Sequence, residues 1–524
     1  MLIKIINDIK RNWRYLVCCA LLSLYALSAL VVLSGSKKQL FTALSCAALL
    51  FLLGVVSRHL FAVMFLLLLL VSSILFHMGQ LWGVHSVASR LQAAYLSPTH
   101  ESLEYLANYG SIVDVILVLY VLVGAGFAYV FHQSLSLSGR GIRGAALALF
   151  VLFLALLQRM EFPAQMLPYV IVPSIVEAAE WKQSVNGRLE FMSGYKAASP
   201  KVINAPLYEK VVVIMGESVN RAHTSAYGYS VNTTPFLKSY VNQTYTYKFD
   251  RVVSPANQTR YAVPIMLSDA TVEDFLLFNK TPSLVTTLKT AGYKTYWLSN
   301  QYSAGKHDSY IATIAAEADV SKTANFAYES GGNGEASYDE VLLSYIDELK
   351  NVRVKNEAFF FHFLGSHFQY SKRCPEGGGI YSNPKNVVEH YDNSVYCSDI
   401  VMAEIYKRFS QYRTLFVFTS DHGEVVSLEL HGHGFLRPSY KEEYQIPLVI
   451  GSSIKNDKLE SVHRESEAKL VNGSQLNRLI RYIIDIDAEF DYGPLFSSKV
   501  IAIDKANVVD HSALISNQKV VDDI

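Results

Sequence analysis

Five apolar stretches in the first third of the 524-residue sequence constrain its fold more than any other feature. They cover residues 15–33, 40–56, 60–76, 113–131 and 145–157. A helix needs roughly 20 apolar residues to cross the hydrocarbon core of a bilayer, so each stretch is a candidate membrane span, although the second, third and fifth are short. We interpret 40–76 as a helical hairpin that turns at residues 57–59. The sequence thus predicts a multi-pass α-helical membrane domain of about five spans over residues 1–158.

Basic residues flank these stretches unevenly, and their distribution predicts how the membrane domain is oriented. They precede the first stretch or fall in alternate short loops: Lys4, Lys10, Arg11, Arg14, Arg58, Arg140 and Arg143. Loops rich in Lys and Arg stay in the cytoplasm, and Lys37 and Lys38, which oppose this assignment, are outnumbered. Four further apolar stretches follow the first, so we expect no cleaved signal peptide. An odd number of crossings then places everything after about residue 160 outside the cytoplasm.

The remaining sequence is more polar and carries no excess of either charge. Lys plus Arg and Asp plus Glu both number 46, so there is no global basic field to hold a nucleic-acid backbone, and we exclude that class of partner. A chain of this length is expected to form two or more domains. We therefore predict an interfacial linker over 159–205 and a second domain over 206–524.

The second domain has the pattern of an α/β fold, in which short apolar runs alternate with stretches long enough for helices. The candidate strands are residues 211–215, 293–298, 359–364, 415–419 and 446–450. Such near-continuous apolar runs are typical of strands buried on both faces of a parallel sheet, where ligands bind beyond the carboxyl ends of the strands. Chemically active residues follow three of these strands: Glu217, His367, and the run Asp421, His422 and Glu424.

Glu217, Asp421 and His422 form an oxygen and nitrogen set that suits a zinc ion, with a fourth position for a nucleophile. Manganese or magnesium would fit the imidazole less well. Each residue alone is more often a helix cap or a surface group. Their location at equivalent strand ends favours a common metal site.

The chain resembles the phosphoethanolamine transferases of the bacterial envelope, in the alkaline phosphatase and sulfatase superfamily. The resemblance rests on these motifs: Gly216-Glu217-Ser218 with Arg221, Tyr227-Gly228-Tyr229, Thr233-Thr234-Pro235, Gly365-Ser366-His367, Tyr391-Asp392-Asn393 and Ser420-Asp421-His422-Gly423-Glu424. It implies an inner-membrane protein, with a multi-pass helical membrane domain followed by a periplasmic catalytic domain of α/β/α architecture.

The resemblance also implies roles for individual residues. The family's nucleophile is a threonine at the start of a helix, which corresponds to Thr259 in the stretch Asn257-Gln258-Thr259-Arg260-Tyr261. The implied zinc ligands are Glu217, Thr259, Asp421 and His422, with one zinc ion expected and a second allowed. The implied catalytic or substrate-binding residues are His367, Arg221, His431 and His433. Of the last two, which follow the Asp-His-Gly-Glu motif closely, we weigh His433 slightly ahead of His431.

Two of the five cysteines, Cys374 and Cys397, lie in the polar part of the chain. They are either a disulfide, which would require an oxidising compartment such as the periplasm, or two unrelated thiols. In the resembled family a disulfide often holds a loop at this place, which favours their pairing.

The resemblance implies transfer of phosphoethanolamine from phosphatidylethanolamine, a membrane lipid, to lipopolysaccharide or another envelope glycan through a phosphothreonine-type adduct, by a monomer. The acceptor stays open between lipid A, a core sugar, a periplasmic glucan and a protein. The first alternative is a phosphoglycerol transferase with the same fold and threonine. A hydrolase of the superfamily is a second, although Thr259 lacks the Cys/Ser-x-Pro-x-Arg setting of sulfatases. A membrane scaffold with an inactive domain is disfavoured because all four ligand positions are filled.

Overall fold

The computed structural model describes residues 6–7, 9–10, 12–32, 37–82, 118–126, 129, 146–149, 183–195, 206–301, 310–324, 338–349, 354–434, 439–501 and 508–516. The chain divides into two compact units, Met1–Ala179 and Glu180–Ile524. Most of the predicted linker lies outside the described residues, so the domain boundaries at 158 and 205 stay predictions.

Three helices that pack on one another form most of the described part of the first unit: α2 (Trp13–Val32), α3 (Lys37–Val56) and α4 (Arg58–Trp82). The first three predicted stretches fall within these helices, and Ser57 alone separates α3 from α4. The Tyr15 hydroxyl donates to the Gly54 carbonyl at 2.6 Å, and a Cβ on Gly54 would lie 2.0 Å from the Cys19 Sγ. This glycine therefore allows α2 and α3 to approach closely.

The fourth and fifth predicted stretches are described only in part, and their described residues are helical, at 118–126, 129 and 146–149. Among the residues that the structure describes, no helix combines the length and the hydropathy of a membrane crossing.

A seven-stranded sheet forms the centre of the second unit, in the order β2-β11-β7-β1-β6-β4-β5. The strands are β1 (Lys210–Gly216), β2 (Thr246–Lys248), β4 (Lys294–Ser299), β5 (Val320–Thr323), β6 (Glu357–His362), β7 (Thr414–Ser420) and β11 (Leu448–Ser452). Strands β7, β1, β6, β4 and β5 are parallel. Every residue of β1 is buried, as its continuous apolar run predicts for a strand covered on both faces.

The predicted strand at 446–450 corresponds to β11, but it runs antiparallel to β7 and not parallel as expected. Among the described residues between β7 and β11 there is only the 3-10 helix η7 (Lys441–Glu443) and short strands, with no crossover helix. A parallel strand needs a connection that returns to the other end of the sheet. Without one, β11 enters the sheet from the end at which β7 leaves it.

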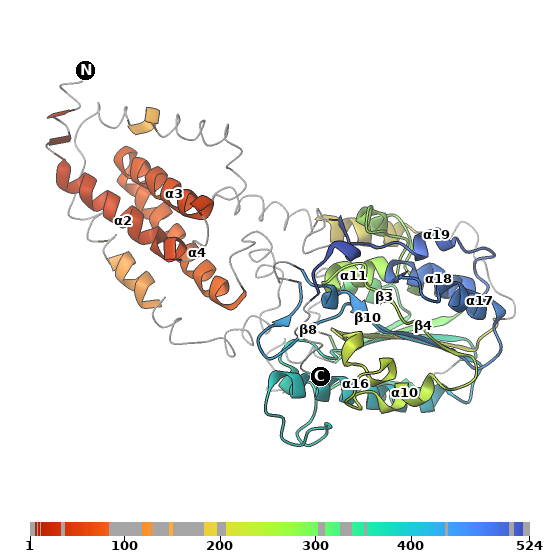
Figure 1. Ribbon diagram of the computed structural model, residues 1–524. Coiled ribbons are helices and arrows are strands. Elements are labelled where there is room, and N and C mark those ends of the chain that lie inside the picture. The colour runs from red at the N-terminus through yellow and green to blue at the C-terminus, as the bar shows by residue number, and fades with distance from the viewer. Residues whose placement is uncertain are drawn as a thin grey trace. The chain divides into compact units, whose positions relative to one another are not determined.

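Helices cover both faces of the sheet, which gives three layers (Figure 1). One face carries α10 (Pro235–Tyr240), α15 (Val341–Glu348) and α16 (Val387–Phe409), whose apolar side chains share a core with β1, β6 and β7. The remaining helices of this unit are α11 (Thr259–Met266), α12 (Leu284–Thr290), α13 (Tyr310–Ala315), α17 (Asp457–Ser466), α18 (Leu476–Ile483), α19 (Tyr492–Leu495) and a helix at 183–194. Figure 1 places α11, α17, α18 and α19 on the opposite side from α10 and α16.

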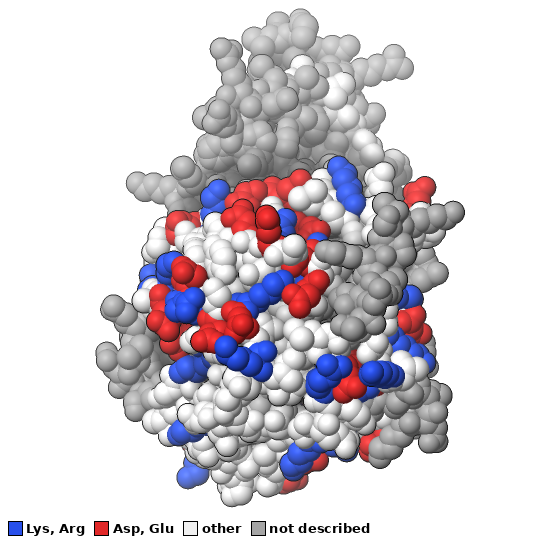
Figure 2. Space-filling view, turned by 90° about the vertical axis from the view of Figure 1, so that its right-hand side faces the viewer, with Lys and Arg blue, Asp and Glu red and all other residues white. Residues whose placement is uncertain are grey.

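Short strands support the rim at the carboxyl ends of the parallel strands. They are β3 (Val252–Val253), β10 (Gln445–Ile446) and β12 (Val471–Asn472) in one sheet, β8 (Val425–Val426) with β9 (His431–Gly432), and β13 (Lys499–Ile501) with β14 (Val508–Asp510). Acidic and basic side chains are intermixed over the face that Figure 2 shows. That face therefore has no broad field of one sign.

Candidate metal and nucleophile site

The sheet brings Glu217 next to Asp421 and His422 because their strands are neighbours. In the β1 and β7 ladder Gly216 pairs with Ser420, so Glu217 and Asp421 both begin the loops that follow paired strand ends. All three ligand candidates are fully buried. Gly365, at the end of β6, has a φ of 52°, and a Cβ there would lie 2.9 Å from the Glu217 amide nitrogen. A side chain at 365 would thus push the neighbouring loop away.

Thr259 is the first residue of α11, and its hydroxyl lies against this group. Its Oγ1 is 3.2 Å from the Glu217 Oε2 and 3.3 Å from the His422 Nε2. The His422 Nε2 is also 3.3 Å from the Glu217 Oε1 and 3.3 Å from the Asp421 Oδ2. The four residues that the sequence nominates as ligands therefore converge on one small volume.

Main-chain contacts orient Asp421 and His422 so that one atom of each faces this volume. The Asp421 Oδ1 accepts from the main-chain N–H of Ser218 at 3.1 Å and of His422 at 2.7 Å, whereas its buried Oδ2 has no hydrogen-bond partner in the described part of the chain. The His422 Nδ1 lies 2.9 Å from the Gly423 carbonyl, which favours a proton on Nδ1 and leaves Nε2 as the nitrogen whose lone pair a cation can take in place of a proton. An orphaned carboxylate oxygen and an imidazole lone pair fit a divalent cation.

Glu217 is held by two side chains, one of which the sequence analysis missed. The Ser218 hydroxyl donates to Oε1 at 2.8 Å, and the Gln301 side-chain amide donates to Oε2 at 2.9 Å and to the Phe363 carbonyl at 2.8 Å. Gln301 follows the carboxyl end of β4 and so lies at the same rim as the other strand ends. That position is the feature of the sequence that could have identified it as a site residue. It orients a candidate ligand from outside the ligand set.

Burial and mutual charge displace the pKa values of this cluster in opposite directions. Burial alone would raise the pKa of Glu217, but the hydrogen bond and charge of His422 hold it well below its usual value. Burial and the charge of Glu217 raise the pKa of Asp421 to about 7. Burial would lower the pKa of His422, yet Asp421 and Glu217 raise it to about 10. Because the pKa values of Asp421 and His422 are raised, the cluster keeps a proton near neutral pH. A bound cation would replace this proton and balance the charge of the two carboxylates.

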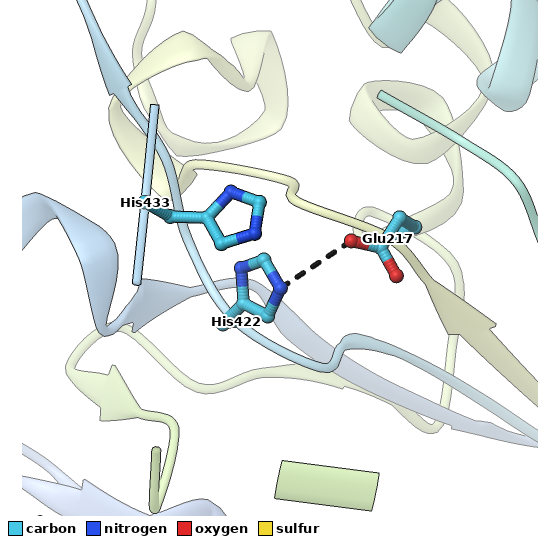
Figure 3. Close-up of side chains that lie close together, drawn as sticks. All are labelled: Glu217, His422 and His433. Carbon is cyan, nitrogen blue, oxygen red and sulfur yellow. Dashed lines mark ion pairs between the residues drawn. The ribbon is translucent and has the colours of Figure 1, made fainter. Parts of the chain in front are cut away.

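His433 joins the cluster, and His431 does not. Ligand atoms of Glu217, His422 and His433 lie within 4.8 Å of one another, and the rings of the two histidines are 4.0 Å apart (Figure 3). The His433 Nδ1 lies 2.5 Å from the Glu424 Oε2. His431 stacks on Phe368, with ring centroids 6.3 Å apart. The geometry therefore favours His433 over His431 at the metal site.

His367 and Arg221 differ in their surroundings. Burial lowers the pKa of His367 to about 4, with the Glu217 charge opposing, so its imidazole is neutral at pH 7. Its Nδ1 is buried and has no partner among the described residues. Arg221 lies in the 3-10 helix η2 (Arg221–His223) and donates to the Asp250 carbonyl. Its predicted contact with substrate stays a prediction.

A disulfide joins Cys374 to Cys397, with the two Cα atoms 5.6 Å apart. It ties the loop that follows His367 to helix α16. Arg373, next to the disulfide, donates to the carbonyls of His367 at 3.1 Å and of Phe368 at 2.9 Å. The loop that carries His367 is therefore anchored at both the disulfide and the main chain.

Comparison with known proteins links this geometry to a family. The sulfatase family model matches residues 209–476. The chain is 28% identical over 267 residues to the phosphoethanolamine transferase EptC of Escherichia coli, which covers 47% of this chain and 45% of that protein. It is 25% identical over 274 residues to the putative transferase YhbX of Escherichia coli, with 51% and 48% covered. The chain spans about half the length of the curated relatives it matches.

Solved structures share the fold. The integral membrane lipooligosaccharide phosphoethanolamine transferase A of Neisseria meningitidis superposes with a TM-score of 0.60 at 18% identity, over 90% of this chain and 95% of that one. The periplasmic domain of EptC from Escherichia coli gives a TM-score of 0.50 at 21% identity, over 60% and 98%. The resemblance to phosphoethanolamine transferases is thus confirmed, and the second unit has the α/β fold of the sulfatase and alkaline phosphatase type.

Proposed function

Since the chain belongs to the sulfatase family, we propose that it is a zinc-dependent transferase that moves phosphoethanolamine from phosphatidylethanolamine to lipopolysaccharide, on lipid A or the core. Curated phosphoethanolamine transferases among its relatives support the transferred group. The donor is embedded in a bilayer, which gives a reason for an apolar first unit of about five spans in the inner membrane. The second unit would then lie in the periplasm, where a disulfide is stable.

The position of the Thr259 hydroxyl carries this proposal. It is partly exposed and 3.2 to 3.3 Å from two buried candidate ligands, so it can face both a cation and an incoming phosphate. A free threonine hydroxyl is a poor nucleophile at neutral pH. When bound by Glu217, Thr259, Asp421 and His422, zinc supplies a Lewis acid that lowers the pKa of this hydroxyl and offsets charge on the phosphoryl oxygens.

The chain's own residues account for the remaining steps. The Thr259 oxygen forms a bond to phosphorus, and the bond from phosphorus to the diacylglycerol oxygen breaks, which leaves phosphoethanolamine on the threonine. During this attack His433 or His367 takes the proton of the Thr259 hydroxyl and gives it to the departing diacylglycerol oxygen; in the second displacement it takes a proton from the acceptor and returns it to the Thr259 oxygen. Attack by the acceptor restores the Thr259 hydroxyl. The positive end of the helix dipole at the start of α11 favours the phosphate anion.

The test is transfer of a labelled headgroup by the purified full-length chain in detergent. We expect label to move from phosphatidylethanolamine first to the protein and then to lipopolysaccharide, with ping-pong kinetics. Thr259→Ala should lower transfer by about a million-fold, the loss typical of a deleted nucleophile. Thr287→Ala is the matched control, because the Thr287 hydroxyl donates to the carbonyl of Ser283, the N-cap of its own helix, at 2.9 Å.

Mass spectrometry of envelope glycolipids from cells with and without the protein complements this assay. Transfer from phosphatidylglycerol in place of phosphatidylethanolamine would replace the proposal with a phosphoglycerol transferase. An unmodified glycolipid profile, together with release of the headgroup to water, would identify a hydrolase.

A further inference from the structure

Glu443 lies outside the ligand set, yet it contacts three loops of the site. It ends the 3-10 helix η7 and is fully buried. Its Oε2 accepts from the Asn257 side-chain amide at 2.9 Å and from the Gly434 main-chain N–H at 2.7 Å. Its Oε1 accepts from the Tyr440 main-chain N–H at 2.7 Å. Its own carbonyl accepts from the Gly423 N–H at 2.9 Å.

Three of these four partners are close neighbours of a site residue. Asn257 is two residues before Thr259, Gly434 follows His433, and Gly423 follows His422. The Glu443 carboxylate therefore joins the loop that carries the nucleophile to the loop that carries His433. Its main chain holds the loop that carries His422.

Two glycines show how tightly these loops fit together. A Cβ on Gly423 would lie 2.2 Å from the Glu442 carbonyl oxygen, so η7 packs directly on the loop that carries His422. Gly434 has a φ of 74°, and a Cβ there would lie 2.9 Å from the Gln258 Cγ. The Gln258 side-chain amide donates to the Gly434 carbonyl at 3.1 Å. The loops therefore approach closely at both glycines and have little room to shift against one another.

We infer that Glu443 is a positioning residue that keeps Thr259 and His433 aligned with the metal ligands, an inference that rests on the proposed function. Three N–H groups point at its carboxyl oxygens, which accept from all of them. A glutamine would present its own NH₂ to at least one of these donors. A displacement of the nucleophile by about 1 Å is enough to cost roughly 100-fold in rate.

Glu443→Gln in the full-length chain tests this inference through two independent measurements. In hydrogen–deuterium exchange we expect faster exchange in peptides that cover residues 255–262 and 431–434. In the transfer assay we expect kcat to fall by about 100-fold with KM unchanged, because the hydrogen bonds of the substituted carboxylate go to Asn257, Gly434 and Tyr440, which belong to loops of the site. Glu442→Gln is the control: its carboxylate accepts from the Ser516 hydroxyl at 2.6 Å, so neither measurement should change.

A double variant identifies the route of the effect. If Glu443 acts through Asn257, the losses in kcat from Glu443→Gln and Asn257→Ala should be far from additive. Wild-type exchange at 255–262 in Glu443→Gln, or an unchanged kcat, would overturn the inference. If the wild-type chain transfers no headgroup, the proposed function fails on its own, and the exchange pattern still decides whether Glu443 holds the two loops together.

Discussion

At the scale of single residues, Asp421 provides a direct test for a bound cation. Its Oδ1 is engaged by two main-chain N–H groups, and its Oδ2 has no partner in the described part of the chain. In Asp421→Asn the amide oxygen should keep the main-chain contacts, which leaves an NH₂ where a cation needs a lone pair. We expect zinc affinity to fall by about 100-fold or more, since even residues behind the ligands contribute about 10- to 100-fold. Competition with a chromogenic chelator measures this affinity.

Thermal unfolding of the same proteins adds a second measure. A ligand that binds only the folded state raises its stability, so a chelator should lower the wild-type midpoint and leave Asp421→Asn unchanged. Asp399→Asn is the control, because Asp399 is also buried but accepts from the N–H groups of Phe236 and Leu237 at the start of α10. It should lose stability, by about 1 kcal/mol, and bind zinc normally. Normal zinc binding by Asp421→Asn would contradict the assigned ligand set.

The sequence nominates the ligand candidates but not the residues that orient them. Glu217, Asp421 and His422 directly follow apolar strands, so their meeting at one rim can be predicted from the strand pattern alone. Gln301 reaches Glu217 only because β6 alone separates β4 from β1 in the sheet, and strand order is not written in the sequence. The choice between His431 and His433 likewise depends on which way each side chain points at the end of the β8–β9 hairpin, and the sequence does not specify this.

At the scale of elements, Arg188 fixes the helix at 183–194 to the rest of its unit. Its buried guanidinium pairs with Glu317, donates to the carbonyls of Phe278 and Thr281, and lies 4.2 Å from the centre of the Phe278 ring. Glu317 also accepts from the hydroxyl of Thr286 at 2.7 Å. Arg188→Ala would leave this carboxylate buried without its cation. We expect a loss of about 3–5 kcal/mol in the free energy of unfolding.

Denaturant unfolding of the purified chain checks this loss. Arg408→Ala is the surface control, because Arg408 pairs with Glu404 and Asp347 on partly exposed side chains and should contribute under about 1 kcal/mol. Glu317→Gln in the Arg188→Ala background should recover part of the stability, since it removes the unpaired charge. Equal losses from Arg188→Ala and Arg408→Ala would show that the buried pair does not hold the helix in place.

Five strands of the central sheet were predictable because each is an apolar run ended by polar residues. The five predicted strands correspond to β1, β4, β6, β7 and β11. The predicted direction of β11 was wrong because the direction of a strand depends on the connection that leads to it. The sequence of residues 421–447 does not show clearly whether this connection contains a crossover helix. The edge strands β2 and β5 were missed, since Thr246–Lys248 and Val320–Thr323 are short and half-polar.

At the scale of the whole molecule, the two units are constrained by different kinds of signal. Long apolar runs predict helices in the first unit, and three of them fall in α2, α3 and α4. The orientation rests on basic residues, of which Arg140 and Arg143 lie outside the described residues. The side of the membrane on which the site lies is therefore predicted from the distribution of basic residues and not from the fold.

Selective labelling of two engineered cysteines tests that orientation. Leu428, on the turn between β8 and β9, is 64% exposed, and Ile9, ahead of α2, is 44% exposed. A membrane-impermeant maleimide added to intact spheroplasts should label Leu428→Cys at once and Ile9→Cys only after lysis. The unaltered chain is the blank for the protein's own cysteines: Cys374 and Cys397 are joined in a disulfide, and Cys18, Cys19 and Cys46 lie within α2 and α3. The opposite pattern would put the site in the cytoplasm, on the wrong side of the inner membrane for a periplasmic acceptor, and would remove the oxidising surroundings that the disulfide requires.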